Sequence, residues 1–121
     1  MLFSMDDISF DDNNNVVEKS IEDFNKAVLH GDVISSSVWK FVYYNDIIRV
    51  IDTVEYRDEA GRWYYPIDVI FELEGTSFSF TYYRGLTEYQ ENEFDDMKAV
   101  PVHKVVKTIV VEEWEVIEKD N

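Results

Sequence analysis

The sequence predicts an α+β domain in which an N-terminal helix packs on a curved, mainly antiparallel, five-stranded meander sheet. Three observations predict it. Apolar residues alternate along residues 63–73 and again along 78–82, which is typical of strands with one buried face. Apolar residues recur at helical spacing along residues 17–28, and short polar turns separate the apolar runs between residues 38 and 83.

The first fourteen residues are predicted to form an N-terminal arm, followed by a single domain over residues 15–121. Phe3–Phe10 predicts either a short edge strand or a loosely attached arm. The whole chain of 121 residues is long enough for one real core, and its 45% hydrophobic and 16% aromatic content argues against disorder.

A helix is predicted from about Val16 to His30. Asn15 and Glu18 have the spacing of a capping box, with Asn in place of the usual Ser or Thr. Gly31 is suited to end the helix, because glycine readily adopts the left-handed conformation found there. The residues predicted to form its apolar face are Val17, Ile21, Phe24 and Val28.

Four strands joined by short turns are predicted to follow. The first, residues 38–44, would place Trp39, Phe41 and Tyr43 on one face. The second covers residues 48–56, and the third and fourth form a hairpin over residues 63–83. In that hairpin Gly75 can adopt the positive φ that a tight turn needs. The predicted inward residues of the third strand are Trp63, Tyr65, Ile67, Val69, Phe71 and Leu73.

An acidic loop or short helix over residues 86–99 is predicted to precede a last strand at residues 102–118, which is rich in β-branched residues. The order of a helix and then a meander is similar to that of cystatin-like folds. This is a likeness of topology and implies no function.

The formal net charge of −15 excludes several classes of function. Such a chain repels nucleic acid and anionic membranes, and it is attracted to basic surfaces. Neither a signal peptide nor a membrane span is evident, so the chain is predicted to be cytoplasmic. An acidic surface that only keeps the protein soluble explains the same charge equally well.

The sequence contains no recognisable catalytic, metal-binding or cofactor-binding motif. There are no cysteines, and the two histidines fall on separate predicted elements. The four glycines are isolated turn residues, which excludes a phosphate-binding loop. We therefore predict no catalytic residues, no metal, no cofactor and no enzymatic activity.

The carboxylates themselves are the remaining candidates. Carboxylates on a folded surface can imitate a phosphate backbone, and interleaved aromatic residues are typical interface anchors. The sequence therefore favours a non-enzymatic inhibitor of the DNA-mimic type, such as an anti-CRISPR, anti-restriction or immunity protein, bound to a basic nucleic-acid-handling protein. The predicted partner-binding residues are Glu88, Tyr89, Glu91, Glu93, Phe94, Asp95, Asp96, Glu112, Glu113 and Glu115.

Two alternatives remain open at this stage. One is a ligand-binding or enzymatic domain with a pocket between helix and sheet, lined by Trp39, Tyr43, Tyr65 and Tyr82. The other is a structural or assembly subunit. An exposed outer sheet face, carrying residues such as Tyr64, Ile70 and Tyr83, would favour a homodimer.

Overall fold

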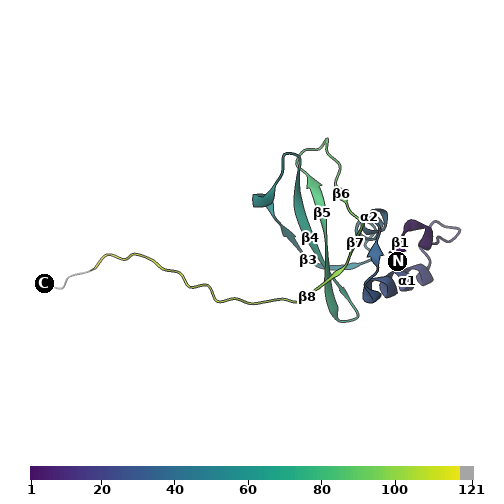
Figure 1. Cartoon of the computed structure of the whole chain (residues 1–121), viewed down its shortest axis with the longest axis horizontal. Coiled ribbons are helices and arrows are strands. Elements are labelled where there is room, and N and C mark those ends of the chain that lie inside the picture. Colours follow the sequence, from purple (N-terminus) through teal and green to yellow (C-terminus); the bar gives the residue numbers. More distant parts are fainter. Residues whose placement is uncertain (118–121) are drawn as a thin grey trace.

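The long hairpin is the centre of the fold, as predicted. In the computed structural model, which describes residues 1–117, β4 (Tyr64–Leu73) pairs antiparallel with β5 (Thr76–Gly85) along its whole length (Figure 1). Glu74 and Gly75 form the two-residue turn, and both have positive φ, of 50° and 80°. Such a turn matches the twist of the paired strands.

The predicted alternation of the hairpin is confirmed in its central part. The inner face of β4 buries Tyr65, Ile67, Val69 and Phe71, and that of β5 buries Phe78, Phe80 and Tyr82. At the two ends the alternation no longer gives full burial. Trp63 is 48% exposed, and Leu73 is half-buried where it packs against the edge of the core.

A mainly antiparallel five-stranded sheet is also present, although only three of its strands are the predicted ones. β3 (Arg49–Glu55) pairs with β4 and carries a bulge between Val50 and Asp52, and a single 3₁₀ turn, η2 (Arg57–Glu59), follows it. On the other side of the hairpin, β6 (Glu93–Phe94) and β8 (Val100–Val102) both pair with β5. The strand order is β3-β4-β5-β6. β8 pairs with the same side of β5 as β6 does, at a different part of that strand.

The predicted first helix is present as α1 (Glu18–His30), and Gly31 ends it with a φ of 83°. The predicted cap at Asn15 is wrong, since the residue in the N-cap position is Val17. Asn15 belongs instead to the preceding turn, where Asp11 Oδ1 accepts hydrogen bonds from the backbone N–H groups of Asn13 and Asn15. The buried residues of α1 are Ser20, Phe24, Ala27 and Val28, while Val17 and Ile21 are half-buried.

The predicted strand at residues 38–44 is wrong, because this segment is a second helix, α2 (Ser36–Tyr44). Two oxygens satisfy the N–H groups at its first turn. Ser35 Oγ accepts from the backbone of Val38 at 3.3 Å, and Asp96 Oδ1 accepts from the backbone of Ser36 at 2.7 Å. The buried residues Val38, Trp39 and Val42 follow the helical period, not alternation.

The N-terminal residues join a second, three-stranded sheet. β1 (Leu2–Phe3) lies at its edge and pairs parallel with β2 (Val33–Ile34), which pairs antiparallel with β7 (Met97–Lys98). A 3₁₀ turn, η1 (Met5–Asp7), follows β1. Phe3 and Ile8 are both buried in the main core, so this segment contributes to packing.

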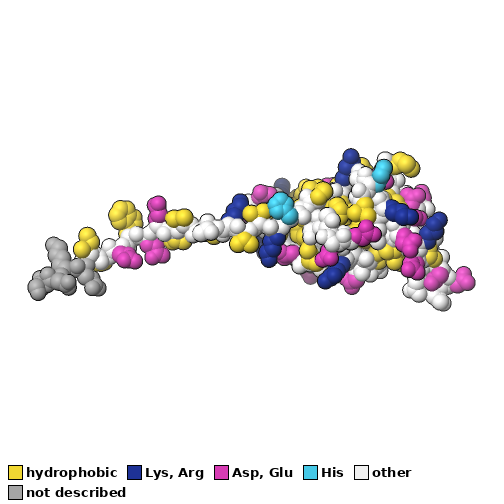
Figure 2. All heavy atoms as spheres, turned by 90° about the horizontal axis from the view of Figure 1, so that it is seen from below, with side chains coloured by type: hydrophobic (Ala, Val, Ile, Leu, Met, Phe, Trp, Pro, Cys, Tyr) yellow, Lys and Arg dark blue, Asp and Glu magenta, His cyan; other side chains and the backbone are white. Residues whose placement is uncertain are grey.

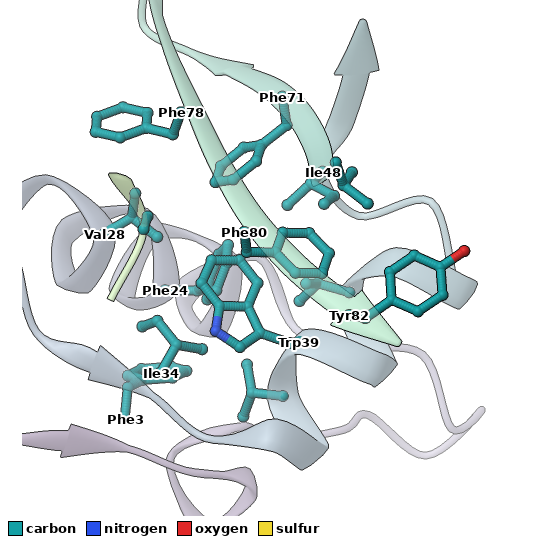
Figure 3. Close-up of a cluster of buried hydrophobic side chains, with 14 of the residues drawn as sticks. Phe3, Phe24, Val28, Ile34, Trp39, Ile48, Phe71, Phe78, Phe80 and Tyr82 are labelled. Carbon is teal, nitrogen blue, oxygen red and sulfur yellow. The ribbon is translucent and has the colours of Figure 1, made fainter. Parts of the chain in front are cut away.

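Trp39 of α2 occupies the middle of the core (Figure 3). Its ring stacks on Phe80 with 4.3 Å between centroids, and it meets the edges of Phe24 and Phe71 at 5.9 and 5.8 Å. Its Nε1 donates a hydrogen bond to the carbonyl oxygen of Met97 at 3.1 Å. The ring therefore links α1, α2, β4, β5 and the small sheet.

The predicted last strand at residues 102–118 is wrong beyond its start. β8 ends at Val102, and residues 103–117 continue as an extended segment, the C-terminal tail, that leaves the body of the protein (Figure 1). Within the described residues the tail pairs with no strand, and Glu118 lies outside them. Its β-branched residues favour an extended backbone, but a strand also needs a neighbour with free hydrogen-bonding groups.

Candidate partner-binding surface

The acidic segment (residues 86–96) is an ordered loop that contains β6 near its end. Of the two predicted alternatives, a loop or a short helix, the structure has the loop, with a turn at residues 88–89 before β6. Asn92 holds the segment in place: its Oδ1 accepts from the backbone N–H of Gly85 at 3.1 Å, and its Nδ2 donates to the Tyr44 hydroxyl at 2.8 Å. The carboxylates are thus displayed on an ordered backbone.

Three of the predicted binding residues in this segment have structural contacts. Phe94 is half-buried and stacks on Tyr82 with 4.8 Å between centroids, so it anchors the segment to the core. Asp96 accepts the hydrogen bond from the backbone of Ser36 at the start of α2. Glu93 lies beside Tyr64; burial, and then the hydrogen bond with Glu93, raises the pKa of Tyr64.

The other four predicted residues of the segment face solvent. Glu88, Glu91 and Asp95 are exposed, and none of their carboxylates takes part in a hydrogen bond or salt bridge among the described residues. Tyr89 is 87% exposed between the first two of them. These four side chains are the part of the segment that is free to contact a partner.

The remaining predicted residues, Glu112, Glu113 and Glu115, lie on the C-terminal tail and are exposed. Figure 1 shows the tail running away from the sheet, so the structure does not bring these carboxylates together with the acidic segment. On the face seen in Figure 2, Asp and Glu alternate with Lys and Arg over the body of the protein. On this face the acidic and basic side chains are mixed. The acidic segment is one of the dense acidic runs of the described residues, with five carboxylates in eleven residues, and residues 6–12 are another, with four in seven.

The aromatic residues proposed to line a pocket fill the core instead. Tyr65 and Tyr82 are buried, as is Trp39. Tyr43 lies against Tyr82 with 5.3 Å between ring centroids, which leaves no open space between α2 and β5 at this point. Burial and the hydrogen bond with Tyr43 raise the pKa of Tyr82, so its hydroxyl remains protonated over the physiological range.

The two histidines lie on separate elements, as predicted. His30 ends α1, and its Nδ1 is 2.9 Å from Asp32 Oδ1. This hydrogen bond is the main reason that the pKa of Asp32 is lowered. His103 begins the C-terminal tail. The contact with Asp32 gives His30 a structural role that requires no catalysis.

Among residues 1–117, no three His, Asp or Glu side chains are grouped closely enough to hold a metal ion. In the same part of the chain, every helix is too short or too polar to cross a bilayer. No protein family, curated protein or solved structure matches this chain. The surface of the protein is therefore the feature from which a function can be inferred.

Gly85 is a positioning residue of the acidic segment that the sequence did not indicate. A Cβ at this position would overlap the carbonyl oxygen of Gln90 and lie 2.8 Å from its Cβ. We expect Gly85→Ala to lower the free energy of unfolding by about 1–3 kcal/mol, as overpacking does. Urea unfolding measures this loss, and faster amide hydrogen exchange over residues 86–96 would show that the segment is displaced.

Gly61→Ala is the matched control, because a Cβ there would meet only the carbonyl oxygen of Tyr64 at 3.7 Å. This substitution is expected to be neutral or to stabilise slightly, since it reduces the entropy of the unfolded chain. Equal effects of the two substitutions would mean that Gly85 does not position the segment.

Proposed function

We propose that this protein is a non-enzymatic, acidic inhibitor of the DNA-mimic type, which acts in the cytoplasm by binding the basic surface of a nucleic-acid-handling protein. A nuclease, a restriction or CRISPR effector, or another DNA-binding protein has the required partner chemistry. The exposed carboxylates of Glu88, Glu91 and Asp95, held on an ordered loop, are the observation that carries the proposal.

Both the acidic segment and the whole chain carry the negative charge that a basic partner would attract. The acidic segment contains five carboxylates and no Lys or Arg, and the whole chain has a net charge of −15. Duplex DNA presents one negative charge per ~1.7 Å of its axis, so a basic groove that accepts DNA also attracts a dense row of carboxylates. Long-range attraction of this kind speeds association.

The stacked aromatic core favours this proposal over a ligand-binding or enzymatic domain. Trp39, Tyr43 and Tyr82 pack against other rings and present no convergent polar groups to a cavity. An assembly role remains the second candidate, because an edge of the main sheet and the C-terminal tail are both exposed.

The proposal is tested by capture from a lysate of the source cells on the immobilised full chain, with duplex DNA as competitor. We expect the captured proteins to be released by duplex DNA and by raised salt, since exposed charges are screened within ~8–10 Å at physiological ionic strength. The combined variant Glu88→Lys, Glu91→Lys, Asp95→Lys is expected to weaken binding by about 100-fold or more, because opposed like charges cost several kcal/mol.

This triple variant leaves the contacts of Glu93 and Asp96 in place, so it should keep the fold. Glu18→Lys with Glu22→Lys on α1 is the control that reverses charge elsewhere on the surface, and it should retain binding. If the native protein and the triple variant capture the same proteins, or if duplex DNA releases none of them, the DNA-mimic proposal is wrong.

A further inference from the structure

One edge of the main sheet is open. β3 is the last strand in the order β3-β4-β5-β6, and on its far side it pairs with no strand of residues 1–117. All seven of its residues are exposed, including the apolar side chains of Val50, Ile51 and Val54. An open edge of this length presents a row of free backbone N–H and C=O groups, which readily accept another strand.

The C-terminal tail has the composition of the strand that this edge lacks. Six of the seven residues in 105–111 are β-branched, and they are followed by the fully exposed Trp114. Figure 2 shows hydrophobic side chains along much of the tail, where nothing covers them. Each buried Val or Ile side chain stabilises by about 1.5–3 kcal/mol, so covering this segment is strongly favoured.

The charges of the two segments match in one orientation. β3 has Arg49 and Glu55 at its ends, and the bulge at Ile51 reduces their separation to five pairing steps, which is the spacing of Lys107 and Glu112 in the tail. Antiparallel pairing sets Arg49 opposite Glu112 and Glu55 opposite Lys107. Parallel pairing of the same residues would set like charges opposite each other at both ends, which destabilises a strand pair.

The path of the tail favours pairing with β3 of another molecule over pairing with β3 of its own chain. Lys104 lines a shallow groove of about 220 Å³ together with Asp52 of β3, and the chain then leaves β3 without following it. To pair antiparallel with its own β3, the tail would have to reverse direction near Lys107. Residues 104–113 contain no Gly, Pro, Asn or Asp, the residues that such a reversal needs.

We propose that two copies of this chain exchange their tails, so that residues 107–112 of each add antiparallel to β3 of the other. The exchange is reciprocal, because each chain supplies one donor strand and one acceptor edge. It extends the main sheet by one strand in each copy and brings the apolar side chains of the two segments into cross-strand contact. This dimer forms through the sheet edge, and it leaves the acidic segment free.

The test uses full-length chains and exchanges the charges at the two ends of the pairing. The tail variant carries Lys107→Glu and Glu112→Lys, and the edge variant carries Arg49→Glu and Glu55→Lys. Alone, each variant sets like charges opposite each other, so its dimer should dissociate about tenfold more readily, or more, than that of the native protein. When the two variants are mixed, they can form a heterodimer in which opposite charges face each other at the ends of both tail–edge pairings.

Sedimentation equilibrium gives the dissociation constants, and far-ultraviolet circular dichroism checks the folds. We expect a native dimer, two weakened variants and a mixture that recovers native affinity as a heterodimer. A native protein that stays monomeric at every concentration would overturn the proposal, as would variants that dimerise like the native protein. A monomeric native protein whose stability falls in each variant and recovers when all four substitutions are on one chain would show that the tail pairs with its own β3.

Discussion

Replacing Phe71 by alanine is expected to lower the free energy of unfolding by about 3–5 kcal/mol. Phe71 is 1% exposed on the inner face of β4, and its ring lies 5.8 Å from that of Trp39 and 5.9 Å from that of Phe78. These rings are fixed by α2 and by the paired strand β5, so the site can collapse only partly around the smaller side chain. Denaturant unfolding followed by circular dichroism measures the loss.

Ile70→Ala provides the matched control for this substitution. Ile70 is the neighbouring residue on the same strand, but it points to the outer face and is only half-buried. Its truncation is expected to cost less than about 1.5 kcal/mol, because part of the side chain is already in water. A larger cost for Ile70→Ala than for Phe71→Ala would mean that the two faces of β4 are assigned the wrong way round.

The hairpin and α1 could be predicted because their signals are local. In β4 a period of two continues through residues 64–72 and in β5 through residues 77–83, and Gly75 marks the turn between them. In α1 the helical period ends at Gly31, which adopts the expected left-handed conformation. The local sequence pattern and the tertiary packing agree at these elements, so the sequence alone is sufficient to predict them.

α2 could not be predicted from composition, because its valines and aromatic residues are typical of strands. The helix forms because its first turn is capped by Ser35 and by Asp96, and because Trp39 fills the centre of the core. Asp96 lies sixty residues away along the chain. Its contribution cannot be read from the segment itself.

The candidate surface was predicted only in part, for the same reason. That the acidic segment reaches solvent follows from its composition. The structural contacts of Phe94 and Asp96 depend on Tyr82 and on the start of α2, which only the folded chain brings near. For the C-terminal tail the sequence indicates an extended backbone but cannot indicate its neighbour, since strand pairing is decided between segments.

Val42→Asp is expected to cost about 3–5 kcal/mol, or to prevent cooperative folding, because it places an uncompensated charge in the core. Val42 is 1% exposed and lies on the same face of α2 as Val38, one turn earlier. Among the described residues, the salt bridges lie at the surface and leave no cation at this position to pair with the new carboxylate. Thermal and urea unfolding followed by circular dichroism measure the effect.

Ser37→Asp is the matched control, since it adds the same charge to an exposed position of the same helix. A carboxylate in the first turn of a helix is favourable, so this variant is expected to be within about 0.5 kcal/mol of the native protein or slightly more stable. The comparison of Val42→Asp with Ser37→Asp also distinguishes the observed helix from the strand that the sequence predicted for residues 38–44. In a strand with Trp39, Phe41 and Tyr43 turned inward, Val42 would face solvent, and Val42→Asp would be tolerated as well as Ser37→Asp.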